Sequence, residues 1–102
     1  MIFISEESEI NLNLNNRAAL YFYAQWMPFH KKMLKMIEKI ELRYKKNKIA
    51  FYAVDVEQFK SLCKRYSVES IPTVVIFRDC CEVKKIEGLV MTAAFRNAFI
   101  DI

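Results

Sequence analysis

Three cysteines in this sequence could carry nucleophilic or redox chemistry. Cys80 and Cys81 are adjacent in a stretch that predicts a turn between strands, where Gly or Asn is usual, and Cys63 stands in a predicted helix. Cysteine reacts as the thiolate, so Cys80 and Cys81 are possible reactive thiols or could close a strained vicinal disulfide. The alternative is that Cys80 and Cys81 are incidental surface residues and that Cys63 fills a small space in or beside the core.

The single histidine, His30, is the other residue with possible site chemistry. Together with Met27 it could bind a metal ion, or it could form a pH-sensitive contact. Two ligands do not complete a metal site, and the sequence offers no clear third. A polar residue in the first turn of a helix is the simpler interpretation, so we predict no metal and no cofactor.

Composition limits the possible classes of protein. The 102 residues predict a single domain spanning 1–102, and an apolar content of 54% with eight Phe and five Tyr supplies its core. One glycine excludes glycine-rich phosphate loops and dinucleotide fingerprints. The start of the chain does not resemble a secretory signal, no apolar run is long enough to span a membrane, and three cysteines fit a reducing compartment. We therefore expect a cytoplasmic protein without a membrane partner.

The excess positive charge is concentrated in one segment. The net charge is +4, and residues 30–48 carry eight Lys and Arg against two Glu. Four of these basic residues recur at intervals of four and form a stripe on a predicted helix: Lys31, Lys35, Lys39 and Arg43. Such a stripe is usually a solvated face, and the alternative is a surface for nucleic acid or an acidic partner. No aromatic residue alternates with the lysines, so base stacking is not indicated.

The hydrophobic pattern predicts an α/β fold. Three apolar runs rich in β-branched and aromatic residues predict strands buried on both faces: 18–24, 49–54 and 73–77. Helical spacing predicts helices over 31–44, 57–66 and 91–102. Residues 83–87 alternate and predict a hairpin with 73–77 across a turn at 78–82. Residues 1–4 are a predicted edge strand, followed by a short helix near 5–14. This order predicts a mixed sheet with helices on both faces.

Several residues, taken in order, resemble the thioredoxin family across the whole chain. Residues 20–26 read Leu-Tyr-Phe-Tyr-Ala-Gln-Trp and resemble the family's central strand, which ends in Ala-X-Trp. Asp55 stands at the end of the next strand, Ile71-Pro72-Thr73 resembles the cis-proline tripeptide, and Gly88 follows the terminal hairpin. The resemblance implies a thioredoxin fold, a three-layer α/β/α arrangement around a central mixed sheet of four to five strands, with a cis peptide before Pro72.

The residues after Trp26 differ from the family where its chemistry resides. Thioredoxins have Cys-Gly-Pro-Cys-Lys, and this chain has Met27-Pro28-Phe29-His30-Lys31. Thiol–disulfide exchange requires one thiolate to attack and a second thiol to resolve the mixed disulfide. Neither Met nor His can do either.

Two further departures point the same way. By the resemblance, the family's buried aspartate corresponds to Tyr21 and the nearby lysine to Ala53. None of the three cysteines is expected beside Trp26. The resemblance therefore implies a chain that no longer performs thiol exchange.

The resulting prediction is a redox-inactive protein that binds a peptide or protein partner. Pro28 is expected at the first helical position, with Met27 and Phe29 exposed beside Trp26. The predicted binding groove consists of seven residues: Trp26, Met27, Pro28, Phe29, His30, Ile71 and Pro72. Two alternatives are an atypical thiol–disulfide oxidoreductase of cell redox homeostasis that uses Cys80 or Cys81, and a basic adaptor for nucleic acid.

Overall fold

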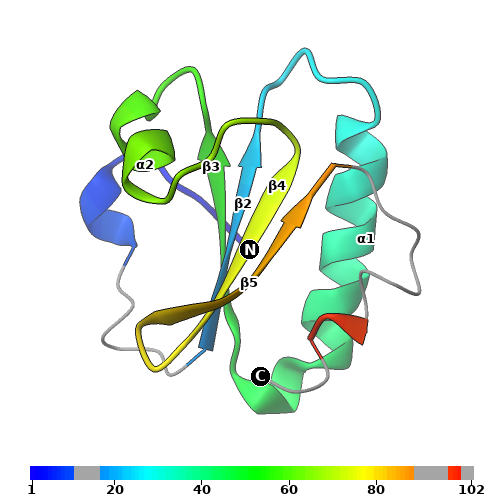
Figure 1. Cartoon of the computed structure of the whole chain (residues 1–102). Coiled ribbons are helices and arrows are strands. Elements are labelled where there is room, and N and C mark those ends of the chain that lie inside the picture. The colour runs from blue at the N-terminus through cyan, green and yellow to red at the C-terminus, as the bar shows by residue number, and fades with distance from the viewer. Residues whose placement is uncertain (11–16, 89–96, 100–102) are drawn as a thin grey trace.

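The computed structural model describes residues 1–10, 17–88 and 97–99, and a five-stranded mixed sheet forms the centre of this part of the chain (Figure 1). The strand order is β1-β3-β2-β4-β5. The first three of these strands are mutually parallel, whereas β4 is antiparallel to both β2 and β5. The strands comprise β1 (Ile2–Phe3), β2 (Arg17–Tyr23), β3 (Ala50–Asp55), β4 (Thr73–Arg78) and β5 (Cys81–Glu87).

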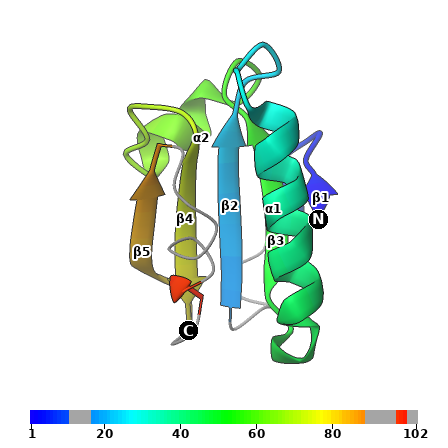
Figure 2. The same ribbon diagram turned by 90° about the vertical axis from the view of Figure 1, so that its right-hand side faces the viewer.

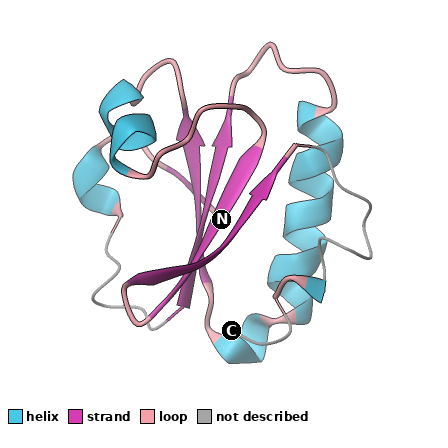
Figure 3. Cartoon of the chain, in the orientation of Figure 1, coloured by secondary structure: helices cyan, strands magenta, loops and turns pink. Residues whose placement is uncertain are grey.

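Helices cover both faces of the sheet. Helix α1 (His30–Arg43) packs on one face, whereas α2 (Lys60–Arg65) and the 3-10 helix η1 (Glu7–Glu9) lie on the other (Figures 2 and 3). A second 3-10 helix, η2 (Lys45–Asn47), follows α1. The predicted three-layer α/β/α arrangement around a mixed sheet of four to five strands is confirmed. No helix within the described residues has the length and apolar character needed to cross a bilayer.

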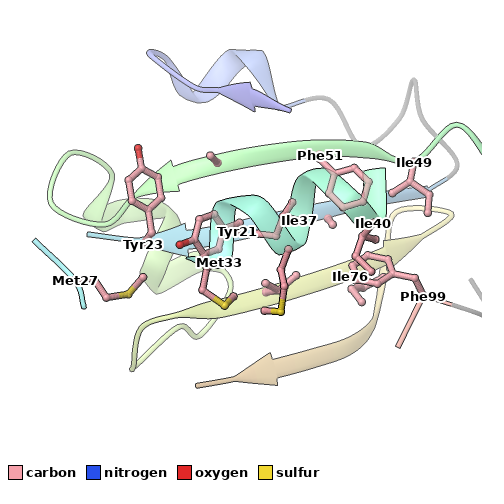
Figure 4. Packing of buried hydrophobic residues seen from close by; sticks show 14 of the residues in the cluster. Tyr21, Tyr23, Met27, Met33, Ile37, Ile40, Ile49, Phe51, Ile76 and Phe99 are labelled. Carbon is pink, nitrogen blue, oxygen red and sulfur yellow. The ribbon is translucent and has the colours of Figure 1, made fainter. Parts of the chain in front are cut away.

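Alternation along β2 divides the core into two parts. Tyr21 and Tyr23 face α1 and pack with Met33, Ile37 and Phe51 (Figure 4). Their neighbours on the strand, Leu20 and Phe22, face α2 and pack in the second cluster, with Leu62. Because successive side chains of a strand point to opposite faces, the continuous apolar run 18–24 fits a strand that is buried on both sides.

The predicted elements differ from the structure mainly at their ends. Helix α2 begins at Lys60 rather than at residue 57, and the predicted N-terminal helix is a single 3-10 turn over Glu7–Glu9, with residues 11–14 outside the described part. The hairpin turn is tighter than predicted because Asp79 and Cys80 both adopt positive φ, as a two-residue type I′ turn requires. The predicted closing helix lies mostly outside the described residues; within them, Phe99 is fully buried.

Candidate functional site

The candidate site lies where β2 and β3 end, at the loop that leads into α1 (Figure 1). The two strands are parallel and pair Tyr23 with Asp55, so their carboxyl ends share one edge of the sheet. At this edge the side chain of Asp55 is buried and accepts a hydrogen bond from the backbone N–H of Glu57 at 2.9 Å.

Two of the three large side chains in this loop are exposed and one is buried. Trp26 is 69% exposed and Phe29 is 59% exposed, as predicted for Phe29. The prediction that Met27 is exposed is wrong, because its side chain is 7% exposed and belongs to the core beneath α1 (Figure 4). The loop turns inward there, with the Met27 N–H bonded to the Ala24 carbonyl at 3.0 Å, and an unbranched methionine can fill the irregular space at the end of the core.

Helix α1 begins later than the position of Pro28 suggests. His30 is its first residue and Phe29 is the N-cap residue, with φ 66° and ψ 9°. The carbonyl of Phe29 accepts the first helical hydrogen bond, from Met33 at 2.9 Å. The prediction that Pro28 occupies the first helical position is therefore wrong, and Pro28 is an exposed turn residue. The left-handed conformation of Phe29 is strained, at roughly 1–2 kcal/mol for a residue with a Cβ atom.

His30 is held by two tyrosines of β2. Its Nδ1 lies 2.9 Å from the Tyr21 hydroxyl, and its ring stacks on Tyr23 with centroids 4.5 Å apart and planes 6° from parallel. Desolvation lowers the pKa of His30, opposed in part by the Asp55 carboxylate, so the imidazole is neutral at pH 7. Burial raises the pKa of Tyr21, so its hydroxyl stays protonated, and the tautomer of the imidazole sets which of the two groups donates.

The positions that correspond to the family's buried aspartate and lysine lie side by side. Tyr21 and Ala53 are paired across β2 and β3, and both are buried. A phenol and a methyl group thus stand where a carboxylate and an ammonium group would assist thiol chemistry.

An apolar hollow of about 320 Å³ opens beside Trp26. Its lining comes from the loop after β2, from β3's end, from α2 and from the segment before β4: Trp26, Val56, Cys63, Val68, Glu69, Ser70 and Ile71. The prediction that no cysteine lies beside Trp26 is wrong, because α2 brings Cys63 into the same lining. Burial raises the pKa of the Cys63 thiol and lowers its reactivity at neutral pH.

The segment before β4 completes one rim of this hollow. The peptide bond between Ile71 and Pro72 is cis, and both side chains are partly exposed. Within the described residues, the backbone N–H and carbonyl of Ile71 have no hydrogen-bond partner.

A second hollow, of about 420 Å³, lies on the other side of the loop. Its lining is Gln25, Met27, Phe29, His30, Lys31 and Lys32. The first hollow is mainly apolar, whereas this one is bordered by two exposed lysines. The structure thus places the seven predicted site residues at one edge of the sheet but not in one groove. Trp26 and Ile71 line the apolar hollow, and Met27, Phe29 and His30 line the second one. Pro28 and Pro72 line neither.

Cys80 and Cys81 lie at the opposite end of the molecule. Both are exposed, and they follow β4, whose six residues run away from Pro72 and separate the turn from the hollow by about 20 Å. No disulfide joins the three cysteines. No cluster of three potential metal-ligating residues occurs in the part of the chain that the structure describes.

Comparison with known proteins identifies related sequences and folds. A family model described as thioredoxin matches residues 4–101. The thioredoxin of Mycoplasmoides gallisepticum is 32% identical over 81 residues, which cover 78% of this chain and 79% of that protein. Protein disulfide isomerase-like 2-2 of Oryza sativa is 40% identical over 73 residues, or 70% of this chain, but this chain spans only 20% of its length.

Solved thioredoxin structures share the fold. The oxidised thioredoxin of Plasmodium falciparum superposes with a TM-score of 0.84 at 20% identity, over 95% of this chain and 92% of that one. A mutant thioredoxin from Halobacterium salinarum gives a TM-score of 0.82 at 22% identity, over 95% and 85% of the two chains. At these identities the structural likeness concerns the fold alone.

Proposed function

The chain belongs to the thioredoxin family, and from that premise we propose that it is a redox-inactive member that binds a peptide or protein segment. The proposed binding site is called the groove below. It comprises the two hollows together with Ile71 and Pro72, the two residues that precede β4.

The observation that carries this proposal concerns the two positions at which active thioredoxins have cysteine thiols. Met27 is buried in the core, and His30 is a neutral imidazole hydrogen-bonded to Tyr21. A thioether and an imidazole cannot form or resolve a mixed disulfide. The start of α1 therefore has no electron donor for disulfide reduction.

The features that suit binding are retained. Trp26 has a surface of about 150–250 Å² when fully exposed, so covering its exposed 69% at about 25 cal/mol per Å² gives roughly 3–4 kcal/mol of hydrophobic free energy. The backbone of Ile71, which has no hydrogen-bond partner among the described residues, can pair with an extended peptide, as in strand addition. Together these supply an apolar anchor and a direction for the bound segment.

The test is capture of partners by immobilised protein, compared between the natural chain and Trp26→Ala and Phe29→Ala variants. We expect both substitutions to reduce capture. Leu42→Ala is the matched control, because Leu42 is 73% exposed near the other end of α1 and lies outside the groove. Capture that is unchanged by both groove substitutions would place the binding site elsewhere.

A second candidate is a single-thiol oxidoreductase, and the position of Cys63 in the apolar hollow favours it over Cys80 or Cys81. The Cys63 thiolate would attack a substrate disulfide, form a mixed disulfide and release one substrate thiolate; an external dithiol such as dithiothreitol would then reduce the mixed disulfide and be oxidised. This candidate would be supported if the protein reduced insulin disulfides faster than dithiothreitol alone, and if the Cys63→Ser variant lost that additional rate. We expect no such rate.

The exposed basic stripe on α1 keeps a nucleic-acid adaptor as a third candidate. The affinity of such an adaptor for nucleic acid would fall steeply with added salt and when the charges of the exposed Lys35 and Lys39 are reversed by substitution with glutamate.

A further inference from the structure

We propose that the groove is selective for charge and takes an extended peptide with one large apolar side chain next to acidic residues. This inference rests on the proposed function and names the chemistry of the partner. The apolar side chain would enter the hollow at Trp26, and the carboxylates would lie in the hollow at Lys31 and Lys32.

The first hollow is suited to a single apolar side chain. Trp26, Val56, Val68 and Ile71 supply apolar lining, and about 320 Å³ is enough for a leucine or phenylalanine side chain. Glu69 belongs to the same lining, so a carboxylate on the peptide is disfavoured there by repulsion.

The second hollow has the opposite electrostatic character. Lys31 and Lys32 line it and are exposed, and neither forms an ion pair with another described residue. No carboxylate lines it. On α1 the first acidic residue is Glu38, six positions beyond Lys32 and about 9 Å along the axis. The Asp55 carboxylate acts on His30 from beneath, but it is one buried charge that accepts a hydrogen bond from Glu57, against two exposed lysines. The balance at the surface of the hollow therefore favours a negatively charged group.

One short segment can reach both hollows. Trp26 lines the apolar hollow, and its two chain neighbours, Gln25 and Met27, line the basic one. The hollows are thus on either side of one short loop. At about 3.3–3.6 Å per extended residue, carboxylates two to four positions from the apolar anchor span about 7–14 Å.

The test uses three synthetic peptides with blocked ends, each with a central leucine flanked by glutamates, glutamines or lysines. Trp26 is the only tryptophan of the chain, so its fluorescence reports occupancy of the apolar hollow directly. At low salt we expect the glutamate peptide to bind several-fold to about tenfold more tightly than the glutamine peptide, since two exposed lysines can each pair with a carboxylate. The lysine peptide should bind more weakly than both.

Charge reversal tests the assignment to particular residues. Lys31→Glu/Lys32→Glu should abolish or invert the preference, and Lys31→Gln/Lys32→Gln should remove it without adding repulsion. Lys45→Glu/Lys46→Glu, at the far end of α1, changes the net charge equally and should leave the order of affinities unchanged.

The outcomes separate this inference from the proposed function. Equal affinities for the three peptides, or equal effects of the two glutamate double variants, would overturn the charge selectivity and leave a groove that binds without it. Absence of any fluorescence change with all three peptides would overturn both.

Discussion

The hydrogen bond between Tyr21 and His30 allows a quantitative test of how the start of α1 is held against β2. The Tyr21 side chain is 2% exposed, and no buried polar side-chain atom in the described residues lacks a partner. His30→Ala would leave the Tyr21 hydroxyl buried without its hydrogen-bond partner. Tyr21→Phe would instead remove the hydroxyl and leave His30, which is partly exposed, able to bond to water.

The two substitutions should therefore differ in their effect on the free energy of unfolding. An unsatisfied buried hydroxyl costs about 1–3 kcal/mol, and a lost hydrogen bond with both partners satisfied costs about 0.5–1.5 kcal/mol. Loss of the ring contact with Tyr23 adds about 0.5–1.5 kcal/mol to the His30 substitution. We expect about 2–4 kcal/mol for His30→Ala and about 1 kcal/mol for Tyr21→Phe.

A double-mutant cycle isolates the contribution of the bond. In the Tyr21→Phe background no hydroxyl is left unsatisfied, so His30→Ala should be milder there, with a coupling of about 1–2 kcal/mol between the two sites. Urea unfolding of the four proteins, followed by circular dichroism, measures it. Tyr44→Phe is a control for the loss of a tyrosine hydroxyl, because the partly buried Tyr44 follows the last residue of α1, at the opposite end of that helix from His30. Additive effects of the two substitutions would refute the argument that His30 acts mainly as the hydrogen-bond partner of Tyr21.

Three further predictions concern the same site and the cysteines. The pKa of His30 in the folded protein lies below its usual value of 6.5, so the unfolded chain binds more protons between these two pH values. The free energy of unfolding should therefore fall as the pH is lowered through that window. In His30→Gln, the urea midpoint should depend less on pH in the same window. Phe29→Gly should raise the free energy of unfolding by about 0.5–1 kcal/mol by relieving the left-handed conformation, while it weakens partner capture; a drop in the urea midpoint would contradict the assigned strain. Alkylation by N-ethylmaleimide, followed by mass spectrometry, should modify the exposed Cys80 and Cys81 before Cys63, and the reverse order would mean that the hollow activates the Cys63 thiol.

Much of the fold could be predicted because its strands and α1 have strong local patterns. The strands β2, β3 and β4 are continuous apolar runs, and α1 has apolar residues at helical spacing, so burial and period agree. Element ends were harder, since Phe29, Asp79 and Cys80 adopt positive φ without the glycine that would signal it.

The exposure of the loop side chains was only partly predictable from the sequence. The exposure of Trp26 and Phe29 follows from their place in a loop. The burial of Met27 depends on the space left beneath α1 by Tyr23 and Met33, which no local pattern records. Two tyrosines in β2, Tyr21 and Tyr23, shortly before the single histidine, were the available signal for the hydrogen bond.

The sequence by itself determined which chemistry is absent from the start of α1, because thiol exchange depends on atom types and the residues after Trp26 provide no thiol. It also determined the α/β class, because continuous apolar runs typical of strands buried on both faces alternate with segments of helical period, and the order of the motif residues added the resemblance to thioredoxins. Only the tertiary structure decided which side chains meet. The contact between Tyr21 and His30, the approach of Cys63 to Trp26 and the separation of an apolar from a basic hollow all depend on how distant segments pack, and packing is a property of the whole chain.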